Sequence, residues 1–195
     1  MRPAPIIATL LAAVAFAVSA PVDAQLGAQL GAQLGAQLGE LREARAALRA
    51  GNPASALVAV DKHLAAKPQD ADGRFLRGVI LTELARPDEA FDAFLMLTQD
   101  YPELPEPYNN VAVLYAARGE YERARANLEM AIRAKPDSAI AYENLGDVYA
   151  RLSSQAYEKA AQLDARNRNA AAKLALAREL VGFAPQKKPD APAPK

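Results

Sequence analysis

Apolar residues recur at steps of three and four along the middle of the chain. Three such series are Leu57, Val60 and Leu64, then Phe91, Phe94, Leu95 and Leu97, and then Leu128, Ala131 and Ile132. This spacing places apolar side chains on one face of an α-helix. Alanine is frequent and aromatic residues make up 6% of the chain, a composition that favours packed helices over sheets. The pattern therefore predicts an all-α fold.

The helical pattern is itself repeated. Pro68, Pro102 and Pro136 are spaced by 34 residues, and a small residue stands both 12 and 24 positions before each of them. The small residues in register are Ala56, Ala90 and Ala124 in one set, and Ala44, Gly78 and Ala112 in the other. A period of this length indicates a repeat architecture, in which each unit packs on its neighbours.

Each unit is expected to be a pair of antiparallel helices. A small residue lets the two helices approach closely, and the proline ends the second helix because it cannot continue it. Inner turns are expected at 51–53, 85–87 and 118–121, and Pro53 and Pro87 can each occupy a first helical turn. The predicted repeat domain spans residues 40–182, with units at about 37–70, 71–104 and 105–138, a short unit at 139–165 and a capping helix at 167–181.

These features resemble the tetratricopeptide repeat family. The third unit carries the family's signature residues at Tyr108, Val111, Ala112, Tyr115, Gly119, Ala124, Leu128, Ala131 and Pro136, and a fourth unit begins with Tyr142, Leu145, Gly146 and Tyr149. The resemblance implies a right-handed superhelical solenoid of about four helix-turn-helix repeats with a C-terminal capping helix. It also implies that the first helix of each unit lines a concave wall on which partner peptides lie.

The fourth unit departs from the period. Alignment of Tyr157, Ala160 and Ala165 with a second helix leaves about five residues missing, and no Gly or Pro marks the inner turn. Residues 139–163 form either one long helix or a helix pair with a cramped joint at Ser153–Ser154, and the sequence favours the long helix. The segment after residue 167 is expected to cap the stack, because the last apolar face of a solenoid needs a cover.

The first 24 residues predict a secretory signal peptide. Arg2 supplies the positive charge, residues 6–18 form an apolar run that is short for a membrane span, and small residues precede Gln25. An uncleaved membrane anchor is the alternative. We expect export to a bacterial periplasm with cleavage after Ala24, so that membrane contact occurs only through the signal peptide before cleavage.

Two further segments have biased composition. Residues 25–39 belong to a low-complexity run in which the word AQLG is repeated without error, and its four glycines cost a helix about 4 kcal/mol. Slippage during DNA copying explains such identity without a function; a docked extension of the first helix and a weak self-association stripe are the alternatives. Residues 183–195 are rich in Pro, Ala and Lys and are expected to be disordered or extended.

Composition argues against catalysis. The chain has 23 basic and 23 acidic residues, no cysteine and one histidine, so it shows neither the basic excess of a nucleic-acid binder nor a cluster with metal-ligand spacing. His63 is expected to be a satisfied packing residue. Glu40, Glu43, Asp88 and Glu89 stand at helix starts, where carboxylates complement the helix dipole. We predict no enzyme activity, no cofactor, no metal and no nucleic-acid partner.

The resemblance assigns a peptide-binding wall to the first helices. Its predicted members are Arg45, Arg49, Phe75, Val79, Glu83, Asn109, Asn110, Val113, Glu143, Asn144, Asp147 and Arg151. Charge runs from basic at one end to mixed acidic at the other, which could orient an extended peptide. Asparagine can both donate to and accept from a peptide backbone. Because Asn109 stands where the family's carboxylate clamp needs a lysine, that clamp is not expected.

The sequence thus favours a non-catalytic adaptor of the bacterial envelope that binds a protein or peptide. A self-associating structural repeat protein and an accessory subunit of an envelope-assembly enzyme are the alternatives. The sequence identifies neither the partner nor the oligomeric state.

Overall fold

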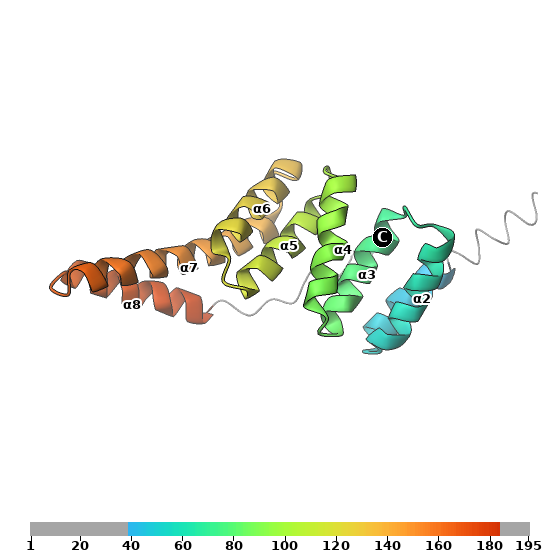
Figure 1. Ribbon diagram of the computed structural model, residues 1–195, viewed down its shortest axis with the longest axis horizontal. Helices are drawn as coiled ribbons and strands as arrows, with labels where there is room; N and C mark the ends of the chain where they lie inside the picture. The colour runs from blue at the N-terminus through green and yellow to red at the C-terminus, as the bar shows by residue number, and fades with distance from the viewer. Residues whose placement is uncertain (1–38, 184–195) are drawn as a thin grey trace, which may run out of the picture. The chain divides into compact units, whose positions relative to one another are not determined.

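A computed structural model describes residues 39–183, and every regular element in that range is a helix (Figure 1). The predicted signal peptide, the AQLG run up to residue 38 and the tail from residue 184 lie outside the described residues. Among residues 39–183, no helix has both the length and the apolar composition that a membrane span requires.

The helices form successive hairpins. The first unit pairs an N-terminal helix, described from residue 39 to residue 49, with α2 (Pro53–Ala66). The second pairs α3 (Ala71–Glu83) with α4 (Pro87–Asp100), and the third pairs α5 (Pro105–Ala117) with α6 (Tyr121–Ala134). The chain continues with α7 (Ala139–Leu163) and α8 (Arg168–Phe183). Each of the helices α2 to α8 packs on the next one along the chain.

The inner turns lie where the sequence predicts them. Gly51 and Gly119 have φ angles of 73° and 77°, a conformation that glycine adopts without strain. The equivalent residue of the second unit is Ala85, which has a φ angle of 55° despite its Cβ atom. Pro53 and Pro87 begin α2 and α4, where a missing backbone N–H costs no helical hydrogen bond.

Capping side chains begin the first helices of units two and four. Asp70 Oδ2 accepts from the N–H of Gly73 at 3.0 Å, and Ser138 Oγ accepts from the N–H of Ala141 at 3.4 Å. These contacts satisfy backbone donors that have no partner within the helix.

The repeated small residues form the closest helix contacts. Ala56, Ala90 and Ala124 are fully buried at 0% exposure. A Cβ atom added at Gly78 would lie 2.6 Å from the Phe94 ring, so only glycine lets α3 and α4 approach this closely. The described residues thus form a helical repeat solenoid, as the 34-residue period predicts.

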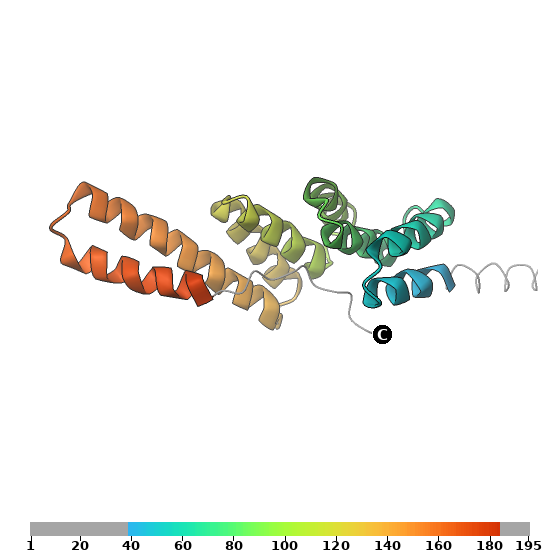
Figure 2. The same ribbon diagram turned by 90° about the horizontal axis from the view of Figure 1, so that it is seen from below.

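The fourth unit contains one continuous helix. α7 runs without a break through 25 residues, so Ser153 and Ser154 do not form a joint. The favoured sequence prediction is confirmed. α8 packs antiparallel on the second half of α7 (Figure 2), where Arg178 donates to Glu158 at 3.0 Å and Lys173 lies 5.7 Å from the centre of the Tyr157 ring.

Candidate peptide-binding face

Side-chain contacts connect the first helices of successive units, in one case through a cluster that the intervening second helix shares. Arg45 of the N-terminal helix forms an ion pair with Asp72 of α3 at 3.8 Å. Apolar side chains of α3 and α5 share one buried cluster. Asn144 of α7 donates from Nδ2 to Asn109 Oδ1 of α5 at 2.7 Å. The four first helices therefore form one continuous side of the stack, which is the side assigned to the peptide-binding wall.

Five predicted members of the wall are buried. Phe75 is 9% exposed and its ring lies 5.5 Å from that of Phe94, while Val79 is 3% exposed in the same cluster. Asn109 and Asn144 are 3% and 7% exposed. The fifth is Asn110, at 0% exposure. The expectation that these five line an open wall is corrected, because they pack between helices.

The asparagine side chains form hydrogen bonds within the protein instead of facing solvent. Asn109 and Asn144 bond to each other and fix the spacing between units three and four. Asn110 donates from Nδ2 to the carbonyl oxygen of Glu106 one turn earlier, at 2.9 Å. Its Oδ1 atom is buried and has no partner among the described residues, an arrangement that normally costs free energy. Asparagine at these positions therefore has a structural use that its sequence pattern did not reveal.

Seven predicted members remain accessible. Arg49, Glu83 and Glu143 are exposed, and Arg45, Val113, Asp147 and Arg151 are half-buried. The basic side chains Arg45 and Arg49 belong to the N-terminal helix, and the acidic side chains belong to α3 and α7. Peptide contact stays a prediction for these seven residues. Sequence reasoning missed the exposed Asp72, although its place in the first turn of α3 put it next to this face.

His63 is a packing residue, as predicted. It is 3% exposed, and its Nε2 atom lies 2.7 Å from Asp70 Oδ2. The same carboxylate oxygen caps α3 through Gly73. The contact therefore ties the second helix of unit one to the first helix of unit two.

At least one carboxylate of each pair at the helix starts forms an ion pair. Arg86 donates to Glu89 at 2.6 Å, and this hydrogen bond lowers the pKa of the Glu89 carboxyl. Glu40 lies 2.9 Å from Lys62 Nζ, and the hydrogen bond between them raises the pKa of the Lys62 ammonium. Among residues 39–183, no group of three or more His, Cys, Asp or Glu side chains could hold a metal ion.

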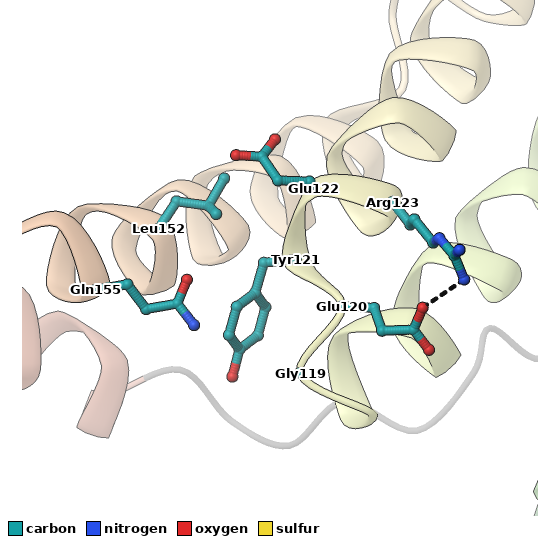
Figure 3. A pocket seen from close by; sticks show the side chains of 7 residues that line it. All are labelled: Gly119, Glu120, Tyr121, Glu122, Arg123, Leu152 and Gln155. Carbon is teal, nitrogen blue, oxygen red and sulfur yellow. Dashed lines mark hydrogen bonds and ion pairs between the residues drawn. The ribbon is translucent and has the colours of Figure 1, made fainter.

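A cavity of about 340 Å³ lies where the turn between α5 and α6 meets α7. Its lining residues are Gly119, Glu120, Tyr121, Glu122, Arg123, Leu152 and Gln155. Figure 3 shows the Tyr121 ring between the turn and Gln155, and Glu120 accepts from Arg123 at 2.6 Å. This ion pair reaches solvent, with the Arg123 side chain 68% exposed and the Glu120 side chain 35% exposed.

Comparison with known protein families identifies the helix hairpins. A family model described as "Tetratricopeptide repeat" matches residues 41–105, and one described as "TPR repeat" matches residues 112–153. The matched segments are tetratricopeptide repeats. The resemblance seen in the sequence is thus confirmed, and the tetratricopeptide repeats include the first half of α7.

Solved tetratricopeptide structures share this fold. The TPR domain of P58(IPK) superposes with a TM-score of 0.61 at 16% identity, covering 86% of this chain and 46% of that one. MamA gives 0.56 at 22% identity, covering 75% and 82%. A thermophilic TPR protein of Thermus thermophilus gives 0.57 at 21% identity, covering 75% and 83%. At these identities the likeness concerns the fold alone.

A curated human relative matches by sequence. The protein O-mannosyl-transferase TMTC1 of Homo sapiens is 34% identical over 98 residues, which are 48% of this chain and 11% of that protein. The chain therefore spans about a tenth of the relative's length, and the match carries no transferase activity to it.

Proposed function

We propose that this protein is a non-catalytic scaffold that holds an extended segment of a partner protein along its first helices. The observation that carries this proposal is the continuous side formed by the N-terminal helix, α3, α5 and α7, with basic side chains at one end and acidic ones further along. A solved neighbour supports it: the first TPR of Spaghetti (RPAP3), described as bound to an HSP90 peptide, superposes with a TM-score of 0.56 at 15% identity.

The exposed charges define how a peptide would lie. Arg49 is exposed at the first unit, and Glu83 and Glu143 are exposed at the second and fourth. Acidic residues of the partner would lie near Arg49, and basic residues near Glu143. Charge complementarity of this kind sets the direction of binding and the association rate more than the affinity. Binding should therefore weaken as ionic strength rises.

The setting we propose is the bacterial envelope. What supports it is the N-terminal pattern of Arg2, an apolar run over residues 6–18 and small residues before Gln25. Mass spectrometry of the protein from a periplasmic fraction should find an N-terminus at Gln25. A cytoplasmic protein that retains residues 1–24 would contradict this setting without affecting the peptide-binding face. An accessory subunit of an envelope enzyme would use the same face.

Affinity capture with matched variants tests the binding face. Wild-type protein, Arg49→Glu and Arg133→Glu are used in parallel to capture proteins from an envelope extract. Both arginines are exposed, but Arg133 lies on the second helix α6. Proteins that bind the wild type and Arg133→Glu but are lost with Arg49→Glu are ligands of the proposed face. If the two variants capture the same proteins in the same amounts, the proposal fails.

A further inference from the structure

Large exposed hydrophobic side chains collect on α7 and α8. Among the described residues, seven large hydrophobic side chains are exposed, and five of them belong to this pair of helices: Tyr142, Tyr149, Leu163, Leu176 and Leu180. Single exposed apolar residues are ordinary, whereas a contiguous group indicates an interaction surface. The group on α7 extends along one line of the helix.

We call this line the α7 stripe. The steps between its residues are alternately four and three. These residues are Tyr142, Gly146, Tyr149, Ser153, Ala156, Ala160 and Leu163. Tyr142 is 53% exposed, Tyr149 46% and Leu163 76%. Gly146, Ser153 and Ala156 are exposed as well, and Ala160 is half-buried. A 4-3 alternation is the seam along which two helices pack in a coiled coil.

The helices packed against α7 cover its other faces. Val148 packs against α6 in a cluster with Ala124 and Leu128. On a different side, Tyr157 and Glu158 contact Lys173 and Arg178 of α8. A Cβ atom added at Gly146 would meet nothing within 4 Å, which confirms that the stripe is open between these two sides.

The equivalent residues of unit three pack against that unit's own second helix, and neighbouring units contribute to their cover. Tyr108 is 7% exposed and lies in a cluster with Ala131, while Tyr115 packs against the cluster that contains Ala124. Tyr142 and Tyr149 stand 34 residues after Tyr108 and Tyr115. In unit four the second helix is absent from this place because α7 continues straight.

In unit three, the contact between the first and second helices uses residues on two separate helices. Because unit four lacks the inner turn, α7 carries the corresponding residues along one line of a single helix. When the five missing residues are allowed for, Ala160 corresponds to Ala131 and Ser153 corresponds to Ala124. The N-terminal half of the stripe thus carries the aromatic residues of a first helix. Its C-terminal half carries the small residues of a second helix. Within one straight helix, the two halves of the stripe cannot pack on each other. Each half can instead pack on the opposite half of the stripe in a second copy of the chain.

We propose that the α7 stripe pairs with the α7 stripe of a second copy of this chain in an antiparallel, two-fold symmetric contact. Tyr142 then lies opposite Ala160 of the second copy, Gly146 opposite Ala156, and Tyr149 opposite Ser153. Every pair has its midpoint at residue 151, as a two-fold axis requires. Each aromatic ring meets a small residue, which reproduces between chains the tyrosine–alanine packing that unit three makes within itself.

α8 extends the same surface. Lys173, Leu176 and Leu180 follow one another at steps of three and four, so they share one face of α8. Lys173 lies over the ring of Tyr157, a neighbour of the stripe, so this face of α8 lies on the stripe's side of the helix pair. Leu176 and Leu180, at 61% and 63% exposure, border the proposed contact.

Cysteine cross-linking tests the pairing and its register, because the chain has no native cysteine. A Gly146→Cys/Ala156→Cys double variant of the protein is oxidised under mild conditions. The two sites are ten residues apart and therefore about 15 Å apart on one helix, too far for a disulfide within a straight α7. We expect a disulfide-linked dimer. A Gly146→Cys/Leu163→Cys variant has the same surface but the wrong register, and it should give little dimer.

The other outcomes of this experiment overturn the proposal. A monomer that contains an intramolecular disulfide would show that α7 breaks and closes on itself. Equal cross-linking in both double variants would show random collision. Absence of any disulfide at concentrations where sedimentation finds only monomer would show that the stripe does not bind a second copy.

Sedimentation of charge variants gives an independent test. Ala156→Glu places a carboxylate on the stripe, and Gln155→Glu places the same group one residue away, on another face of α7. Both positions are exposed, so both variants should retain the wild-type circular dichroism spectrum. We expect the dimer dissociation constant to rise at least tenfold for Ala156→Glu and to change less than twofold for Gln155→Glu. Equal effects of the two variants would overturn the proposed contact.

Discussion

The first helices of units three and four carry tyrosines at the same spacing, and yet the two units differ in structure. In unit three, Tyr108 is 7% exposed and packs on Ala131 of α6, which folds back along α5. In unit four, Tyr142 is 53% exposed because α7 runs straight through the place where its inner turn would be. The comparison teaches that a repeat signature specifies a helix surface, whereas the turn decides whether that surface is covered by the same unit.

The decisive difference is the length of the connection. Arg118, Gly119 and Glu120 separate the two helices of unit three, and Gly119 has a positive φ angle that ends α5. No glycine follows Tyr149 within α7. The segment directly after Tyr149 begins with good helix formers, namely Ala150, Arg151 and Leu152. The helix continues because nothing in the sequence stops it.

Restoring the missing turn should produce the largest change in the structure of unit four. Insertion of Ala-Ala-Arg-Gly-Glu, a copy of residues 116–120, between Tyr149 and Ala150 gives unit four its full period of 34 residues. We expect α7 to fold into a hairpin in which Tyr142 meets Ala160 of its own chain. About 20 Å of helix would then fold back, so the radius of gyration measured by small-angle X-ray scattering should fall.

Five inserted alanines are the control for this experiment. They add the same length but continue the helix, so they should raise the radius of gyration. If both insertions extend the molecule alike, the turn does not explain the difference between the two units.

Truncation of the equivalent tyrosines compares the covered and the open surface. Tyr108→Ala should lower the free energy of unfolding by about 3 kcal/mol, because it removes a buried ring. It also removes the hydrogen bond that Tyr108 Oη donates to the carbonyl oxygen of Thr98 at 3.1 Å. Tyr142→Ala should cost less than about 1 kcal/mol in dilute monomer. Urea unfolding at low protein concentration measures both, and equal losses would show that the Tyr142 ring is covered in solution.

Much of this contrast could be read from the sequence. The short period of unit four and the lack of Gly or Pro near residue 153 indicated one continuous α7, and Gly51 and Gly119 indicated inner turns. These features are local, because they depend on which residues can continue or end a helix. Ala85 shows the limit of this reasoning, since it adopts a positive φ angle at an inner turn where the sequence has no glycine.

The candidate binding face was harder to predict. The family resemblance assigns Asn109, Asn110 and Asn144 to the peptide-binding wall, but it does not say how deeply neighbouring helices cover them. That depth depends on the distance between α5 and α7, which the Asn109–Asn144 hydrogen bond itself helps to set. Arg49 and Glu143, which have longer charged side chains, are exposed, and peptide contact at both stays a prediction.

The joint between the two units should be sensitive to the loss of one amide. Asn144→Ala removes the donor to Asn109 Oδ1 in a buried place, and we expect a loss of about 1–3 kcal/mol. Asn127→Ala is the matched control, because the Asn127 amide donates to Arg123 within its own helix and links no units. Hydrogen exchange should show faster opening of the first half of α7 in Asn144→Ala. Similar exchange in the two variants would contradict a joint at Asn144.

The two glycines at equivalent places should respond with opposite signs. In Gly78→Ala the new methyl group would meet the Phe94 ring at 2.6 Å, and such overpacking costs about 1–3 kcal/mol. In Gly146→Ala the methyl group meets nothing within 4 Å. That variant should gain about 0.5–1 kcal/mol, because alanine loses less backbone entropy in a helix than glycine does.

Thermal unfolding followed by circular dichroism at low protein concentration measures both glycine variants, and the sign of the change at Gly146 is the informative result. A gain shows that the first half of α7 has no close neighbour at that point in the monomer. A loss as large as that of Gly78→Ala would mean that a helix already lies on Gly146, so unit four would be closed as unit three is. Thermal unfolding at high protein concentration then shows which helix covers Gly146. A second copy covers Gly146 only when the dimer forms, whereas the chain's own helix covers it at every concentration.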